Sequence, residues 1–148
     1  TRLAYVSQGG LFTRRLDQSQ ATELPGTQGA FSTFFSPDSQ WIAFGTGGKL
    51  KKVSLAGGAA VTLCDAPYFS GGSWGEDGTI VASLSLSAGL FGVPAEGGAA
   101  VPLTKMDSSS RVLTHRFPQI LQGGNAAVLT SNIRQVSAYG EASIETLT

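Results

Sequence analysis

The stretch Ser36-Pro37-Asp38-Ser39-Gln40-Trp41-Ile42-Ala43-Phe44 decides how the chain is built. Pro37 fixes its own φ angle and an Asp side chain can hydrogen-bond the backbone two residues on, so residues 37–39 predict a tight turn. Residues 31–36 before the turn and residues 41–44 after it are short apolar runs of the length of a strand. The stretch therefore predicts two strands joined by a turn.

Two more strands follow in the same unit. Residues 45–48, Gly-Thr-Gly-Gly, supply a flexible hairpin, and residues 49–55 alternate polar and apolar side chains as a half-buried strand does. Residues 56–58 turn the chain again, and residues 60–63 are predicted to form an outer strand. One unit therefore has four strands.

The unit recurs along the chain. Leu3-Ala4-Tyr5, Ile42-Ala43-Phe44 and Val81-Ala82-Ser83 lie 39 residues apart, and a looser fourth copy begins at Phe117 and ends at Leu147. Four-stranded units at a period near 40 residues are typical of propeller blades.

We therefore predict an all-β protein, a β-propeller fragment of about four four-stranded blades, two complete and two partial. It forms one segment, 1–148, with approximate units 1–30, 31–68, 69–108 and 109–148. The first unit lacks an inner strand, the last lacks an outer one, and an insertion near residues 107–114 lengthens the third.

The stretch Ser36-Pro37-Asp38-Ser39-Gln40-Trp41-Ile42-Ala43-Phe44 resembles the repeat signature S-P-D-G-x-x-I-A-F of TolB-like β-propellers. Leu55-Ala56-Gly57-Gly58 and Pro94-Ala95-Glu96-Gly97-Gly98 are similar to the hairpin before the outer strand in that family. These repeat motifs are also similar to those of the propeller attached to some bacterial membrane-anchored serine/threonine kinases. The resemblance implies an extracytoplasmic bacterial location and binding of proteins or peptides, although some members host enzymes.

Composition excludes several classes of protein. Hydrophobic residues make up 41% of the chain and charged residues 14%, which argues against a disordered tail. The formal net charge is zero, without the basic excess and stacking aromatics of a nucleic-acid surface. The longest apolar runs are too short to cross a membrane, so no direct membrane insertion is expected. The single cysteine, Cys64, allows neither an intrachain disulfide nor a cysteine-based zinc site.

The basic and aromatic residues of the repeat have structural interpretations. We expect the cluster Lys49, Lys51 and Lys52 to be solvated or to protect a strand edge. Trp41 and Trp74 are expected to pack between blades.

One motif suggests nucleophilic catalysis. Gly71-Gly72-Ser73-Trp74-Gly75 matches G-x-S-x-G, which in serine hydrolases places the serine on a strand-to-helix turn. Here a β-turn and another strand follow, which favours a chance match. Ser73, His115 and Asp77 could form a triad only if the fold brought them together.

His115 and Arg116 are the candidate ligand-binding residues, since they lead into the inner strand of the fourth unit, near one mouth of the propeller channel. Asp38 and Asp77 recur 39 residues apart and are interpreted as turn residues. The alternative interpretation is that a ring of such carboxylates binds calcium. Without it, no cofactor is expected.

Three functional hypotheses follow. The first is a scaffold that binds a protein, peptide or small ligand. The second is a small hydrolase built on the propeller, a lactonase or an esterase. This hydrolase would work either with or without a metal ion. In the third, the chain is only structural. In each case the open ends predict a homo-oligomer or the remaining blades of a longer chain.

Overall fold

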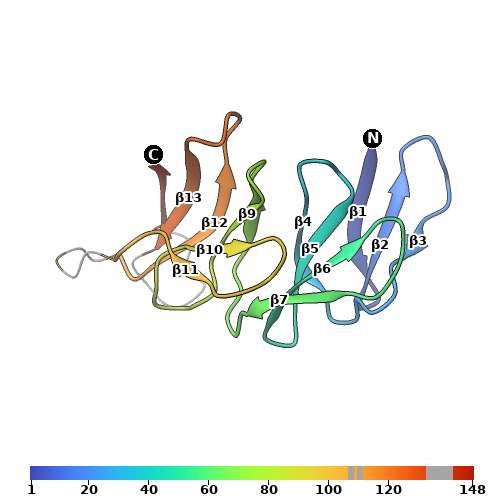
Figure 1. The fold of residues 1–148 in the computed structure, drawn as a ribbon, viewed down its shortest axis with the longest axis horizontal. Helices are drawn as coiled ribbons and strands as arrows, with labels where there is room; N and C mark the ends of the chain where they lie inside the picture. The colour runs from blue at the N-terminus through green and yellow to red at the C-terminus, as the bar shows by residue number, and fades with distance from the viewer. Residues whose placement is uncertain (107–108, 110–111, 133–141) are drawn as a thin grey trace.

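The chain folds into strands alone in the part that the structure describes, residues 1–106, 109, 112–132 and 142–148 of a computed structural model (Figure 1). Fourteen strands are found there, in four antiparallel sheets that stand side by side along the long axis of the molecule. We call these sheets blades 1 to 4.

The blades are built from consecutive strands. Blade 1 contains β1 (Arg2–Ser7), β2 (Gly10–Arg15) and β3 (Thr22–Glu23). Blade 2 contains β4 (Phe31–Phe35), β5 (Trp41–Thr46), β6 (Lys49–Ser54) and β7 (Val61–Asp65). Blade 3 contains β8 (Gly72–Trp74), β9 (Thr79–Ala82), β10 (Phe91–Pro94) and β11 (Val101–Pro102). Blade 4 contains β12 (Thr114–Ile120), β13 (Ala127–Asn132) and β14 (Ala142–Leu147).

Each blade is a meander in which every strand pairs with the next one along the chain. Two blades have four strands and two have three, as predicted: blade 1 begins with the second strand of the repeat, and blade 4 ends with the third. The predicted insertion at 107–114 falls partly outside the described residues. No helix long and apolar enough to cross a membrane occurs among the residues described.

The first strands of blades 2, 3 and 4 lie next to one another. β4 contacts β8, and β8 contacts β12. Each of these strands is followed by a turn, and the three turns lie along the upper edge of the molecule in Figure 1. The inner strands therefore bring residues from three blades together at one end of the molecule.

The core consists of apolar layers between blades. Ile42 and Phe44 of β5 are fully buried in the layer shared with blade 1, whereas Ala43 between them is buried in the layer shared with blade 3. Successive residues of a strand point to opposite faces, so a blade covered on both sides needs a continuous apolar run. This explains why the strand reads Ile-Ala-Phe rather than alternating with polar residues.

One part of the predicted repeat alignment is wrong by a residue. Phe35 pairs with Ile42 in blade 2, and Trp74 pairs with Ile80, not with Val81, in blade 3. The turn that joins the first two strands is one residue shorter in blade 3. Ile80 is therefore the counterpart of Ile42 and faces the preceding blade, while Val81 faces blade 4.

The expected solvation of Lys52 is also wrong. Its side chain is 7% exposed and its Nζ atom lies 4.6 Å from the centroid of the Trp41 ring and 3.4 Å from a carboxylate oxygen of Glu96. Because the Glu96 side chain is 91% exposed, that ion pair adds little stability. Lys49 behaves as expected: it is exposed and forms an ion pair with Asp65.

Candidate functional site

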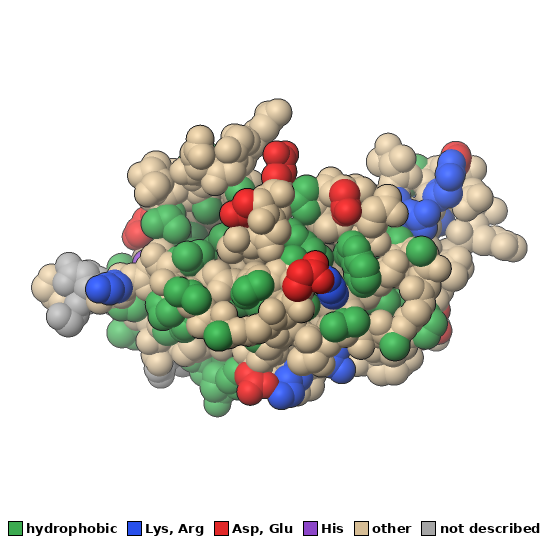
Figure 2. Space-filling model, viewed as in Figure 1, with side chains coloured by type: hydrophobic (Ala, Val, Ile, Leu, Met, Phe, Trp, Pro, Cys, Tyr) green, Lys and Arg blue, Asp and Glu red, His purple; other side chains and the backbone are tan. Residues whose placement is uncertain are grey.

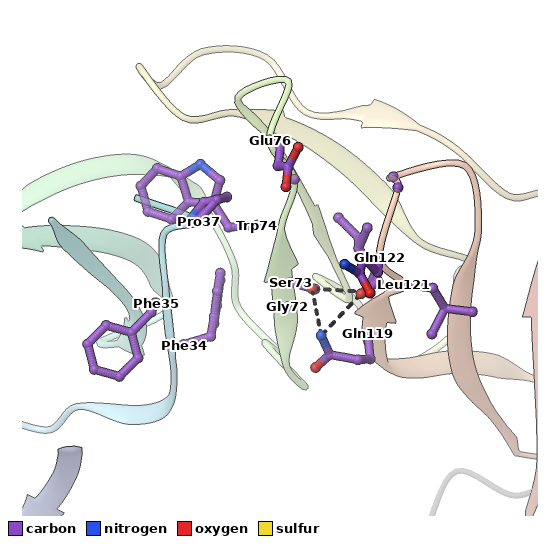
Figure 3. A pocket seen from close by; sticks show the side chains of 14 residues that line it. Phe34, Phe35, Pro37, Gly72, Ser73, Trp74, Glu76, Gln119, Leu121 and Gln122 are labelled. Carbon is purple, nitrogen blue, oxygen red and sulfur yellow. Dashed lines mark hydrogen bonds between the residues drawn. The ribbon is translucent and has the colours of Figure 1, made fainter. Parts of the chain in front are cut away.

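A hollow of about 300 Å³ opens where the inner strands of blades 2, 3 and 4 end (Figure 3). Its wall contains residues from β4 and its following turn, from β8 and its turn, and from the end of β12 and its turn. The lining residues are Phe34, Phe35, Pro37, Gly72, Ser73, Trp74, Gly75, Glu76, Gln119, Ile120, Leu121, Gln122, Gly123 and Gly124. We call this space the mouth hollow.

Side-chain hydrogen bonds fix the turn on the blade 2 side. The Ser36 hydroxyl donates to Asp38 Oδ1 over 2.5 Å and accepts the Trp41 N–H over 2.9 Å. Asp38 Oδ1 also accepts the Gln40 N–H over 3.0 Å. These bonds favour the ionised carboxylate, so the Ser36 hydroxyl first and the Gln40 N–H second lower the pKa of Asp38. The predicted turn role of Asp38 matches this geometry.

The turn on the blade 3 side uses the same device in a shorter form. Asp77 Oδ1 accepts the Thr79 N–H over 2.9 Å, and the Gly75 N–H donates to the Thr79 carbonyl over 2.8 Å. A Cβ atom at position 75 would come within 2.7 Å of Asp77 Oδ1. Glycine at this position therefore lets the Asp77 carboxylate fold back over the turn.

Aromatic side chains form the apolar part of the hollow. Phe34 and Trp74 are partly buried against the core layer between blades 2 and 3, and Phe35 is partly buried against the layer between blades 1 and 2. Ile120 adds an aliphatic surface from blade 4. Side chains anchored in the core keep fixed positions, so the hollow has a rigid apolar wall.

Two polar side chains cross the floor between blades 3 and 4 (Figure 3). Ser73 is 6% exposed, and its Oγ atom accepts the Ile120 N–H over 3.0 Å and an Nε2–H of Gln119 over 3.5 Å. A hydroxyl has two acceptor lone pairs and one proton to donate. These two bonds use both lone pairs of Ser73 Oγ, so the hydroxyl can bind a further partner only by donating its proton.

A second hollow, of about 630 Å³, adjoins the first. It shares Gly75, Glu76, Ile120, Gly123 and Gly124 with the mouth hollow and extends over Asp77 toward β13 and β14. The side chains of Glu76 and Asp77 are the ionisable ones in the two linings, which contain neither lysine nor arginine. The turn between β8 and β9 therefore presents negative charge to both hollows.

The predicted catalytic triad is not brought together. Ser73 contacts Ile120 at one end of β12, and His115 lies five residues back, roughly 16 Å along the strand at about 3.3 Å per residue. The imidazole Nδ1 atom of His115 is 3.0 Å from Thr104 Oγ1, and Asp77 is bonded to its own turn. Among the described residues, no hydrogen bond joins any two of Ser73, His115 and Asp77.

His115 and Arg116 lie within β12 rather than leading into it, because this strand begins at Thr114. Neither lines the mouth hollow. Arg116 is 9% exposed, and its Nε and Nη2 atoms have no hydrogen-bond partner among the residues that the structure describes. Both residues therefore lie near the start of β12, whereas the mouth hollow lies at the end of that strand.

The proposed calcium ligands Asp38 and Asp77 belong to different turns and each bonds its own backbone. Within the part of the chain that the structure describes, no group of three His, Cys, Asp or Glu side chains is placed to hold a metal ion.

Gln119 and the glycine pair Gly123-Gly124 line the mouth hollow but are not among the candidate residues expected from the sequence. The signal that could have found them is the departure of the fourth unit from the repeat, Gln122-Gly123-Gly124 in place of Pro-Asp-Gly. Both glycines have positive φ angles, 94° and 74°, and a Cβ atom at either would meet nothing within 4 Å. At these two positions the turn of blade 4 therefore presents only backbone to the hollows.

Comparison with known proteins supports the fold but no family. No protein-family pattern matches the chain, and no curated protein sequence matches it. Among solved structures, the crystal structure of the tricorn protease superposes with a TM-score of 0.63 at 16% identity and covers 87% of this chain. Selenomethionine-substituted virginiamycin B lyase from Staphylococcus aureus superposes with a TM-score of 0.59 at 10% identity and covers 93%.

A catalytically inactive form of that lyase with quinupristin superposes with a TM-score of 0.60 at 11% identity. The chain spans only 14% of the protease chain and 48% of the lyase chain. Both proteins contain β-propellers, and at such low identity the likeness shows the fold alone. The predicted fold is thus confirmed: the chain is an all-β fragment of a β-propeller.

Proposed function

We propose that this chain is a β-propeller scaffold that binds a peptide, a protein segment or a small ligand at the mouth hollow. The observation that carries the proposal is the hollow itself, where blades 2 and 3 contribute aromatic walls, blade 4 contributes Ile120, and the buried Ser73 hydroxyl can donate its proton. Concave sites with apolar walls and a few convergent polar groups are the usual form of ligand sites.

Of these ligands, a peptide agrees best with the resemblance to TolB-like repeats, whose members mostly bind proteins or peptides. That resemblance, and the extracytoplasmic bacterial location that it implies, are part of the proposal. The hydrolase alternative has less support, because the geometry separates Ser73 from His115, and the hydrogen bonds of Ser73 Oγ to described residues come from Gln119 and the Ile120 N–H, neither of which is a base.

We also propose that the open face of blade 1 is covered in the working protein. Leu3 and Tyr5 are 43% and 37% exposed, whereas their counterparts Ile42 and Phe44 are 0% exposed against the preceding blade. Tyr5 stacks on Phe12 across the same face, with ring centroids 5.8 Å apart. The cover is either a second copy of the chain or further blades of a longer chain.

A peptide-display selection tests the binding function. Heptapeptides selected on the chain should bind at least tenfold more weakly to Gln122→Trp, which fills the mouth hollow with an indole, and equally well to Gln20→Trp, an exposed control in blade 1. Failure to select any peptide, or equal binding by both variants, would contradict the proposal. Turnover of generic esters and lactones that is lost in Ser73→Ala would favour the hydrolase instead.

A further inference from the structure

The turns around the mouth hollow carry acidic side chains. Asp38 lies on the blade 2 turn, and Glu76 and Asp77 lie on the blade 3 turn; all three are exposed. Figure 2 shows acidic side chains along the upper edge above the middle of the molecule, while the basic side chains of that edge lie at its right-hand end, over blade 1. The formal net charge of the chain is zero, so this separation is local.

We propose that the mouth hollow selects an extended peptide segment that carries a lysine or arginine side chain. This inference rests on the proposed binding function and names its ligand class. The carboxylates of Asp38, Glu76 and Asp77, which form the rim of the mouth hollow, attract a cationic side chain. The same carboxylates repel an acidic segment.

Trp74 supplies a second feature that a cation recognises. The face of an indole ring attracts ammonium and guanidinium groups. The chain already contains one such arrangement, with Lys52 Nζ 4.6 Å from the centroid of the Trp41 ring in blade 2. Trp74 is only partly buried and lines the hollow beside the turn that bears Glu76.

The floor of the hollow matches a peptide backbone. The Ser73 hydroxyl is more than nine-tenths buried and has only its proton left to offer, which suits a peptide carbonyl. Gln119 donates from Nε2 to Ser73 Oγ and to the Ile120 carbonyl, so its Oε1 atom can accept a peptide N–H. One donor and one acceptor side by side are what one peptide unit requires.

The two adjoining hollows favour a segment over a single amino acid. They lie on either side of the β8–β9 turn and share five residues, so an extended chain can pass from one to the other over Gly123 and Gly124. The bare glycine turn leaves the backbone of blade 4 open to close approach.

Calorimetric titration with capped pentapeptides, Ala-Gly-Lys-Gly-Ala and its norleucine and glutamate counterparts, tests the inference. We expect the lysine peptide to bind about fivefold more tightly than the norleucine peptide, as one exposed ion pair and one cation–π contact allow. This preference should shrink in Glu76→Gln, which removes the ion pair but leaves the cation–π contact with Trp74, and persist in full in the isosteric control Glu23→Gln. Gln119→Ala should weaken the binding of the lysine peptide and of the norleucine peptide by the same factor.

Equal binding of the lysine and norleucine peptides, or tighter binding of the glutamate peptide, would refute cation selection and leave the binding function standing. Binding of none of these peptides, nor of any selected by display, would contradict the binding function itself. Capped lysine alone binding as tightly as the pentapeptide would refute recognition of a segment. Calcium chloride binding that requires Glu76 would show instead that the rim is a metal site.

Discussion

Ser73 illustrates how a single residue can suggest one chemistry in the sequence and perform another in the fold. Its G-x-S-x-G context is that of a nucleophile, yet its oxygen accepts the Ile120 N–H from the next blade. A serine that serves as acceptor for a neighbouring strand ties β8 to β12, and so joins blades 3 and 4.

Replacing Ser73 by alanine should therefore lower stability rather than remove an activity. The Ile120 N–H would lose its partner, which costs about 1–3 kcal/mol when the group stays buried. Urea unfolding monitored by circular dichroism measures the loss, with exposed Ser19→Ala as control. Equal stability of Ser73→Ala and the unmodified chain would contradict this role, and labelling of Ser73 by a fluorophosphonate would revive the nucleophile.

Asp38 predicts a pH dependence of stability. Its pKa is lowered in the folded chain by the Ser36 hydroxyl and the Gln40 N–H. A depressed folded pKa contributes stability that is present above the unfolded value, about 3.9, and is lost as the pH falls through the folded value.

The unmodified chain should therefore exceed Asp38→Asn in urea midpoint at pH 6, and the difference should shrink as the pH falls below about 4. Denaturation series from pH 6 to pH 2 measure this difference. A gap that stays constant over the whole range would show that the ionised carboxylate of Asp38 does not stabilise the turn.

The individual side chains differ in how far the sequence could predict them. Turn residues such as Asp38 bond within two positions of themselves, so local patterns were sufficient to predict their role. Ser73 and Ile120 are 47 positions apart, and Gln119 reaches Ser73 only after two blades have docked. The floor of the mouth hollow therefore could not be predicted from local sequence.

Strands and blades were predicted well because the sequence pattern of each strand occurs in several units of the repeat. The Ile-Ala-Phe run of β5 indicated burial on both faces, and Ile42, Ala43 and Phe44 are all 0% exposed. The slip at Val81 arose because one turn residue is missing in blade 3: Phe35 and Trp74 are 39 residues apart, whereas Ile42 and Ile80 after the turn are only 38 apart.

A hydrogen bond from a strand N–H to a threonine hydroxyl also recurs, and it was not visible in the sequence. Thr27 Oγ1 accepts the Leu11 N–H over 3.0 Å in blade 1, and Thr104 Oγ1 accepts the Leu90 N–H over 2.7 Å in blade 3. In blade 2 the equivalent Leu50 instead pairs with Cys64 of β7, next to a register shift between Leu50 and Lys51. Because the device skips a blade, it does not appear at the repeat period.

The position of a blade in the chain should decide how much its aromatic residue contributes to the free energy of unfolding. Phe44→Ala removes a fully buried ring between blades 1 and 2 and should cost about 3–5 kcal/mol. Its counterpart Tyr5→Ala, on the open face of blade 1, should cost about 1 kcal/mol, since mainly the stacking with Phe12 is lost. Urea unfolding at low protein concentration compares the two variants, and equal losses would contradict the assignment of Tyr5 to an uncovered face.

The whole molecule is an arc of four blades with open sides. In a closed propeller each blade covers the next, and closure removes the exposed faces and edges. Here Leu3, Tyr5 and Ile144 are 43%, 37% and 79% exposed on the two terminal blades. Terminal repeats without a polar cap are poorly soluble, so this chain studied alone should associate through these blades.

Sedimentation equilibrium at micromolar concentration tests this central claim most directly. The chain has a mass of 15.2 kDa, and we expect a defined species of higher mass, two copies being the simplest closed arrangement. Tyr5→Arg, which places a charge on the open face of blade 1, should shift the population toward the monomer. A well-folded, non-aggregating monomer of 15.2 kDa for the unmodified chain would contradict the account.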